Sequence, residues 1–310
     1  MMNQPRRAYL FGIATVLLWS TVASAFKLSL RYLDPAQLLL YSSLFSIAAL
    51  GGILAIKGRL GVIFTYTGKE YAVSLALGIV NPFLYYLVLF KAYDLLPAQI
   101  VQPINYTWAL TLVFLSIPLL GQKIGVQEIT AGLVSYLGVF IISTKGSISG
   151  LDDVSLPGVA LALGSTVLWA LYWICITRDR RDPVAGLLLN FLFGLPFILV
   201  FCLVFSEIRA ISLPGLAGAA YVGLFEMGIT FVLWLHALKY AENTARVGYL
   251  IFLSPFLSLV FIRVFVGEKI LASTVTGLVL IVAGLVIQHT GAARERGNAQ
   301  ESAPAGEEPR

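Results

Sequence analysis

Long runs of apolar residues alternate along the chain with short polar gaps. Ten runs stand out, at about residues 8–30, 35–56, 70–92, 97–119, 124–144, 155–177, 183–206, 213–239, 243–266 and 270–289. A helix that crosses a bilayer needs about 20 predominantly apolar residues, whereas barrel strands alternate in polarity over about 10. These runs are continuous and of helical length, and backbone amides in lipid must be bonded within the protein. The pattern predicts an all-α integral membrane protein with ten transmembrane helices.

The composition agrees with this prediction. The 310 residues are 58% hydrophobic and 12% charged, with a mean hydropathy of +0.87. A soluble globular domain has about 25% charged residues, so the composition excludes a soluble enzyme. Only residues 291–310, which are polar and contain Gly, Ala and Pro, have the composition of a disordered tail.

The basic residues indicate the orientation in the membrane. The net charge is +5, and the Lys and Arg residues lie in the short gaps, so we expect the lipid bilayer and no nucleic acid as a partner. They are twice as frequent on the side of the N-terminus as on the other side, which predicts cytoplasmic termini in a bacterial-type inner membrane. Cys175 and Cys202 both lie in apolar runs, so we expect no disulfide framework and no CxxC metal site. We also expect no other metal site and no cofactor.

The two halves of the chain resemble each other. Four pairs of motifs recur in the same order: Leu18-Trp19 with Leu168-Trp169, Asp34-Pro35 with Asp182-Pro183, Gly121-Gln122-Lys123-Ile124 with Gly267-Glu268-Lys269-Ile270, and Gly132-Leu133-Val134 with Gly277-Leu278-Val279. Each half holds five runs, and this odd number makes the second half enter the membrane from the opposite side. We predict two inverted five-helix repeats, at 1–150 and 151–290, with the tail at 291–310. Secondary transporters of this architecture bind substrate near the midplane between the halves.

These motifs resemble the drug/metabolite transporter superfamily, EamA type. Leu253-Ser254-Pro255, Gly267-Glu268-Lys269 and the stretch from Gly277 to Gly284 are similar to the family's apolar helix with a Pro, its Gly-Glu-Lys turn and its Gly-rich helix. Gln122 stands where the first copy usually has Glu, and Ser42 and Ser43 stand where the family often has an Arg. The resemblance implies a ten-helix transporter, and the aromatic content is most similar to the bacterial aromatic amino-acid exporter branch.

One carboxylate falls in the middle of an apolar run. Glu226 lies at the centre of the eighth run, and charged groups at that depth almost always face a cavity or a partner. We expect Glu226 to bind a substrate ammonium or to carry a proton. The alternative is a hydrogen bond to a neighbouring helix, for instance to Asn81, its counterpart in the repeat.

Prolines mark predicted breaks or gates in three helices. They are Pro82, Pro103 and Pro255. Broken membrane helices are tolerated where a cavity or neighbouring groups satisfy the freed backbone. We therefore expect the polar and aromatic residues near the first two breaks to line a substrate cavity: Asn81, Tyr85, Gln102, Asn105 and Tyr106. The alternative is packing kinks with hydrogen bonds between helices.

Aromatic residues within the runs supply candidate cavity walls. Trp19 and Trp169 are repeat mates near the middle of their runs, and Trp173 follows Trp169 by one turn. Stacking and cation–π contacts would suit an amino-acid side chain or a flat cation, although packing between helices is the alternative for each residue. The predicted substrate-binding set is completed by Trp108, Thr230 and Tyr249.

Polar residues near the ends of the runs have structural interpretations. Asp34 and Asp182 each precede a Pro, which is typical of a helix N-cap. We expect Lys27 and Lys91 to reach the lipid headgroups, and Glu268 to cap a tight turn.

The chain lacks a Walker A motif, so transport must run on gradients. We predict a secondary transporter, not an enzyme, that exports amino acids, aromatic ones included, and related small metabolites by alternating access, and that acts as a monomer. The alternatives are a multidrug or quaternary-ammonium exporter, a passive channel, and a membrane-embedded lipid enzyme. The sequence leaves the substrate, the direction of transport and proton coupling open.

Overall fold

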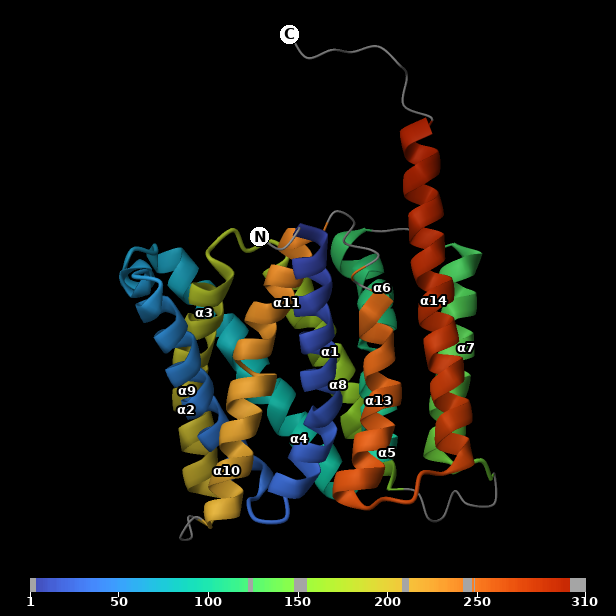
Figure 1. Cartoon of the computed structure of the whole chain (residues 1–310), viewed down its shortest axis with the longest axis horizontal. Coiled ribbons are helices and arrows are strands. Elements are labelled where there is room, and N and C mark those ends of the chain that lie inside the picture. The colour runs from blue at the N-terminus through green and yellow to red at the C-terminus, as the bar shows by residue number, and fades with distance from the viewer. Residues whose placement is uncertain are drawn as a thin grey trace.

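The computed structural model describes residues 4–121, 125–147, 155–207, 212–241, 247 and 249–301. Within these residues the secondary structure is entirely helical, and the helices run side by side along one common direction (Figure 1). The α and shorter η helices are α1 (Gln4–Ser29), α2 (Pro35–Ile56), η1 (Leu60–Phe64), α3 (Gly68–Gly78), η2 (Ile79–Leu84), α4 (Tyr85–Leu95), α5 (Ala98–Asn105), α6 (Trp108–Leu120), α7 (Val126–Ser143), α8 (Leu156–Ile176), α9 (Pro183–Phe205), α10 (Leu213–Tyr221), η4 (Val222–Glu226), α11 (Ile229–Tyr240), η5 (Tyr249–Leu253), α13 (Ser254–Phe261), η6 (Ile262–Val266) and α14 (Ala272–Glu301).

Eight helical segments of the described chain are long and apolar enough to cross a membrane. They are Arg6–Ser29, Pro35–Ile56, Gly68–Leu95, Ala98–Leu120, Val126–Ser143, Leu156–Ile176, Pro183–Phe205 and Leu213–Tyr240. Two shorter apolar helices, Leu250–Val266 and Ala272–Gln288, lie where the ninth and tenth runs were expected. The helical membrane architecture is therefore confirmed.

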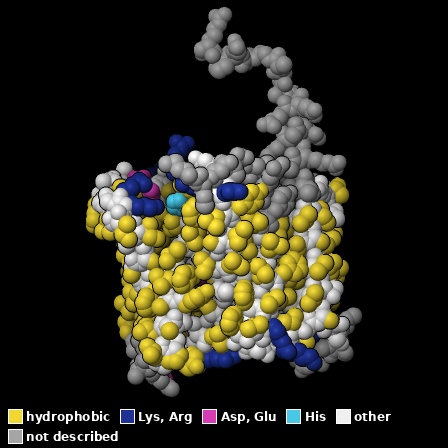
Figure 2. All heavy atoms as spheres, viewed as in Figure 1, with side chains coloured by type: hydrophobic (Ala, Val, Ile, Leu, Met, Phe, Trp, Pro, Cys, Tyr) yellow, Lys and Arg dark blue, Asp and Glu magenta, His cyan; other side chains and the backbone are white. Residues whose placement is uncertain are grey.

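The surface has the polarity of a membrane-embedded bundle. Figure 2 shows hydrophobic side chains over the middle of the face in view, while the coloured Lys, Arg, Asp, Glu and His side chains on this face gather at its two ends. Many large apolar side chains are exposed, among them Ile56, Leu133 and Phe205. Such a belt is stable only against lipid, because large exposed apolar patches are rare on soluble monomers.

Aspartates begin two neighbouring antiparallel helices. Asp34 caps α2 by accepting from the amides of Ala36 and Gln37, and Asp182 caps α9 by accepting from Val184 and Ala185. Each of these residues is followed by a proline at the first helical position, as the sequence predicts. The α2–α9 pair thus has defined starting points at opposite ends of the bundle.

The last helix is longer than the sequence predicts. α14 runs to Glu301 and extends well beyond the other helices (Figure 1), so part of the segment expected to be disordered is helical. The reason is local composition, because Ala, Arg, Glu and Gln in this stretch are good helix formers. Residues 302–310 lie outside the described residues.

Candidate functional site

A cavity of about 340 Å³ lies inside the bundle. Its lining residues come from α1, α4, α5, α6, α8, η4, α11, η5, α14 and the α5–α6 junction: Trp19, Val22, Phe26, Tyr85, Leu89, Tyr93, Gln102, Asn105, Tyr106, Trp108, Ala109, Trp169, Trp173, Glu226, Phe231, Trp234, Ile251, Phe252 and Leu285. Most of the predicted binding residues therefore meet around one space, although they come from distant parts of the sequence.

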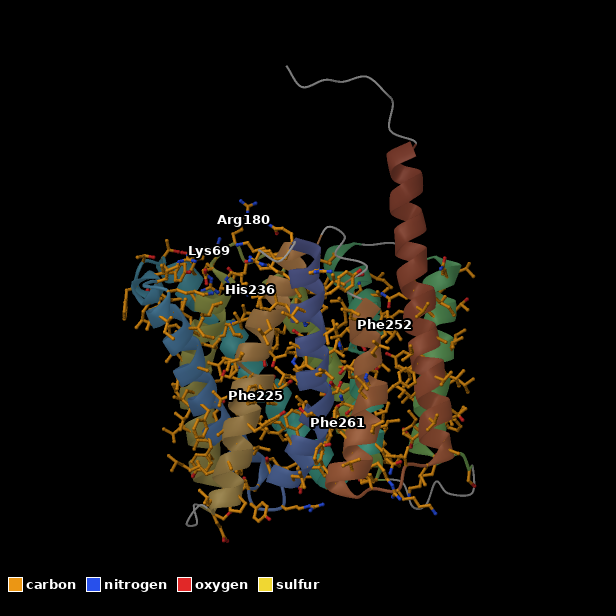
Figure 3. The ribbon with its side chains drawn as sticks, viewed as in Figure 1. Lys69, Arg180, Phe225, His236, Phe252 and Phe261 are labelled. Carbon is orange, nitrogen blue, oxygen red and sulfur yellow. The ribbon has the colours of Figure 1, made fainter. Side chains whose placement is uncertain are left out.

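Glu226 faces this cavity from a break in its helix. It ends η4, and Gly228 has a non-helical backbone (φ −126°, ψ −92°) before α11 begins. Its neighbour Phe225 lies about midway between the two ends of the bundle (Figure 3). Tyr86 donates a hydrogen bond to Oε1 of Glu226 over 3.3 Å. The helix-to-helix bond considered from the sequence thus exists, but its donor is Tyr86 rather than Asn81.

Aromatic rings form the walls around the carboxylate. Tyr85 stacks on Trp169 with ring centroids 4.5 Å apart, and Trp108 stacks on Trp173 at 6.0 Å. Trp169 also meets Trp173 edge-to-face at 6.1 Å. Rigid rings that are already packed together lose little conformational entropy when a flat solute enters.

Neutral polar groups provide a second kind of lining. Tyr93 and Gln102 are hydrogen-bonded through their side chains, and Asn105 donates to the hydroxyl of Ser165 over 3.0 Å. The described lining contains one carboxylate and no Lys or Arg. No basic side chain among these described lining residues would repel a cationic solute.

Two predicted binding residues do not line the cavity. Asn81 is 1% exposed and has a strand-like backbone (φ −143°, ψ 116°) inside η2. This geometry breaks the helical phase, so Asn81 and Tyr85 do not share a face as a continuous helix would place them. Thr230 is fully buried, and its hydroxyl donates to the carbonyl of Phe225. The side chain of Tyr249 lies outside the described residues.

The three predicted helix breaks differ in form. Pro82 lies in η2, where two helical segments meet at a kink. Pro103 lies inside α5, which ends shortly afterwards at the Asn105–Trp108 junction. Pro255 occupies the first turn of α13, just after η5, so it begins a helix rather than kinking one. All three prolines are buried.

Several lining residues were not in the predicted set. Val22 and Phe26 follow Trp19 on the same face of α1, and Leu89 and Tyr93 follow Tyr85 on the same face of α4. Helical spacing from the predicted residues could have found them. Phe231 carries no such signal, because it lies beyond the break at Gly228, which changes the helical phase.

The cavity is closed toward one end of the bundle. Phe26, Leu89 and Tyr93 are buried, whereas the lining residues toward the opposite end, including Trp173 and Trp234, are half-buried. We call the end where α4 finishes and α5 begins the closed end, and the end where α1 begins the open end. The cavity is thus more accessible from the open end.

Comparison with known proteins agrees with this architecture. The uncharacterized transporter YvbV of Bacillus subtilis is 26% identical over 280 residues, which cover 89% of each chain. The aromatic amino acid exporter YddG of Ancylobacter novellus is 28% identical over 257 residues, 81% of this chain and 86% of that exporter. One crystal structure matches with a TM-score of 0.65 at 22% identity, covering 93% of this chain and 98% of the other. At that identity, the likeness shows the fold alone.

A family match extends over both halves of the chain. The EamA-like transporter family matches residues 6–144 and again residues 156–288. The two matched ranges together hold most of the apolar helices and every lining residue of the cavity. The chain is a multi-pass membrane transporter that belongs to the EamA-like transporter family.

Proposed function

We propose that the protein is a secondary transporter that exports small aromatic solutes carrying an ammonium group, aromatic amino acids first among them. The observation that supports this most is the single carboxylate of Glu226 within a cavity walled by stacked tryptophans. The ammonium would lie against Glu226, and the flat side chain would lie between the rings. The similarity to an aromatic amino acid exporter agrees with this proposal.

The transport cycle would use two inverted five-helix repeats with ten spans in all. The shorter apolar helices Leu250–Val266 and Ala272–Gln288 would be the ninth and tenth spans. The twofold family match supports the division into residues 1–150 and 151–290. Helix directions support the inversion: the repeat mates Asp34 and Asp182 begin α2 and α9 at opposite ends of the bundle.

Alternating access would follow from rocking of the two halves around the cavity. The excess of Lys and Arg around the N-terminal end favours a cytoplasmic location for that end. α14 also leaves the bundle at this end (Figure 1). The open end of the cavity would therefore face the cytoplasm, where an exported solute enters.

Uptake into proteoliposomes tests the proposal. Purified protein is reconstituted, loaded with unlabelled tryptophan and given radiolabelled tryptophan outside. We expect saturable uptake that is stimulated by the internal solute, because a carrier returns faster when loaded. Uptake that rises linearly with concentration and ignores the internal solute would indicate a channel and contradict the proposal.

Export of aromatic cations is the second candidate. The described lining has no Lys or Arg to pair with a substrate carboxylate, and an unpaired buried charge is costly. Tryptamine shares the indole and ammonium of tryptophan but lacks the carboxylate. If tryptamine is carried and tryptophan is not, the cation candidate replaces the amino-acid candidate.

A further inference from the structure

The two halves of the chain are hydrogen-bonded to each other at the closed end. Glu268, in the connection between α13 and α14, accepts from the backbone amides of Ala98 over 2.8 Å and Gln99 over 3.1 Å. These amides belong to the first turn of α5, whose N–H groups have no partner within the helix. A carboxylate is favoured at this position because the helix dipole is positive there.

The side chain of Gln99 adds three bonds to the same connection. Its amide nitrogen donates to the carbonyl of Lys269 over 3.0 Å, and its oxygen accepts from the amide of Leu271 at 2.9 Å and the hydroxyl of Thr274 at 3.0 Å. Gln99 is 5% exposed and Thr274 is fully buried. Every one of these bonds joins the first half of the chain to the second, so Glu268 does more than cap its own turn.

This cluster lies directly below the floor of the cavity. Gln102 lines the cavity and follows Gln99 by one turn of α5. Ala98, Ile100 and Val101 are buried around it, so α5 is tightly packed against its neighbours at this level. In a cycle of alternating access, a solute would leave through the closed end only after α5 separates from the α13–α14 connection.

We infer that Glu268 and Gln99 form a latch that holds the cavity shut at the closed end and opens once in each transport cycle. This inference rests on the proposed alternating access. Glu268 is a positioning residue: it acts through α5 and does not touch the solute. Hydrogen bonds to charged groups are about twice as strong as neutral ones, so weakening this bond should shift the balance between the two orientations of the cavity.

Cysteine labelling from each side of the membrane tests the latch. In a background with Cys175→Ser and Cys202→Ala, Val22→Cys places a reporter thiol in the cavity wall. For Glu268→Gln we expect labelling by a membrane-impermeant maleimide to rise about tenfold from the closed-end side and to fall from the open-end side. A general loosening of the fold would raise labelling from both sides, so the opposite directions identify a latch.

Glu128 supplies a matched control. It accepts from the amide of Gly125 over 2.7 Å at the start of α7, so Glu128→Gln makes the same chemical change within one half of the chain. We expect its labelling ratio between the two sides to equal that of the parent. Equal ratios for Glu268→Gln and Glu128→Gln would overturn the inference.

Two smaller changes keep the test decisive if Glu268→Gln does not fold. Thr274→Val removes one bond to Gln99, and Gln99→Ala removes three, so the ratio should shift in that order. Unchanged labelling ratios in both variants would overturn the latch.

Labelling needs no substrate, so the latch and the proposed function can fail separately. A shifted labelling ratio without tryptophan or tryptamine uptake would uphold the latch and contradict the proposed function. Uptake of tryptophan or tryptamine without a shifted labelling ratio would support the proposed function and contradict the latch.

Discussion

Contacts between the two halves of the chain lie in different places at the two ends of the bundle. At the closed end, the Glu268–Gln99 latch lies under the cavity and involves α5, which lines it. At the open end, Arg181 joins the α8–α9 connection to α3, where it donates to the hydroxyl of Ser74 over 2.7 Å and to the carbonyl of Glu70 over 3.0 Å. Neither α3 nor α9 supplies a lining residue.

The α2–α9 pair is held at both ends. At the open end, Asp182 pairs with Arg59 over 2.8 Å. At the closed end, Ser206 donates to the carboxylate of Asp34, and Gln37 donates to the carbonyl of Glu207 over 2.7 Å. From this difference we expect α2, α3 and α9 to act as a scaffold during transport, and the helices around the cavity to separate beneath its floor only when the latch bonds break.

Loss of the Arg181 contacts should have the largest effect on stability. The side chains of Arg181 and Asp179 are 3% and 12% exposed and lie 2.6 Å apart. Arg181→Ala would leave a buried carboxylate without its partner, which costs about 3–5 kcal/mol. We expect a clear fall in melting temperature in detergent.

Arg180 is the matched control for that change. It is exposed and points away from the bundle (Figure 3), so Arg180→Ala should leave the melting temperature close to the parent value. Equal melting temperatures for Arg181→Ala and the parent would show that the open-end contacts do not hold the scaffold.

A lysine at the closed end should have the next largest effect. Lys27 donates to the carbonyls of Tyr93 at 2.6 Å and Leu96 at 2.9 Å, so it caps the end of α4 instead of reaching the headgroups as predicted. Bonds to charged groups contribute about 1.5–3 kcal/mol. Lys27→Met should lower the melting temperature, whereas Lys91→Met should do so little, because Lys91 and Asp94 form an exposed pair. Similar losses in both variants would contradict the capping role.

Acid should weaken the open end through Asp179. Burial raises the pKa of this carboxyl, but hydrogen bonds from Arg181 outweigh burial and hold the pKa below its ordinary value of 3.8. The stability it contributes is present above pH 3.8 and is lost as the pH falls through the lower folded-state pKa. In Asp179→Asn the melting temperature should therefore depend less on pH below about 4 than it does in the parent. An unchanged acid profile in this variant would remove Asp179 as the cause.

The exposed pair between Arg59 and Asp182 should matter least. The Arg59 side chain is 53% exposed, and exposed ion pairs contribute about 0–1 kcal/mol. Arg59→Gln should shift the melting temperature only slightly, and added salt should remove the shift. A loss as large as that of Arg181→Ala would mean that this pair carries much of the scaffold's rigidity.

The sequence predicts the helices well, because a continuous run of about twenty apolar residues in lipid can bond all its backbone amides internally only as a helix. It also predicts much of the cavity, since buried polar and aromatic residues such as Glu226 and Trp169 are costly or unusual where they face lipid. It fails at Asn81 and Thr230. Both lie at breaks where the 3.6-residue period no longer fixes which way a side chain points.

Hydrogen bonds between helices that are distant in the sequence could not be predicted either. Nothing in the spacing indicates that Tyr86 would bond Glu226, or that Glu268 would bond the start of α5. Such contacts depend on how whole helices pack, and each helix could present several faces to several neighbours.

The most direct measurement is tryptophan and tryptamine uptake by Glu226→Gln in proteoliposomes, with the capping residue Glu70, which lies outside the cavity, changed to Gln as a control. Removing one partner of a buried charge pair typically costs 2–5 kcal/mol. Uptake at low solute concentration should therefore fall at least about tenfold, while Glu70→Gln transports normally. Uptake by Glu226→Gln equal to that of the parent for both solutes would contradict the account.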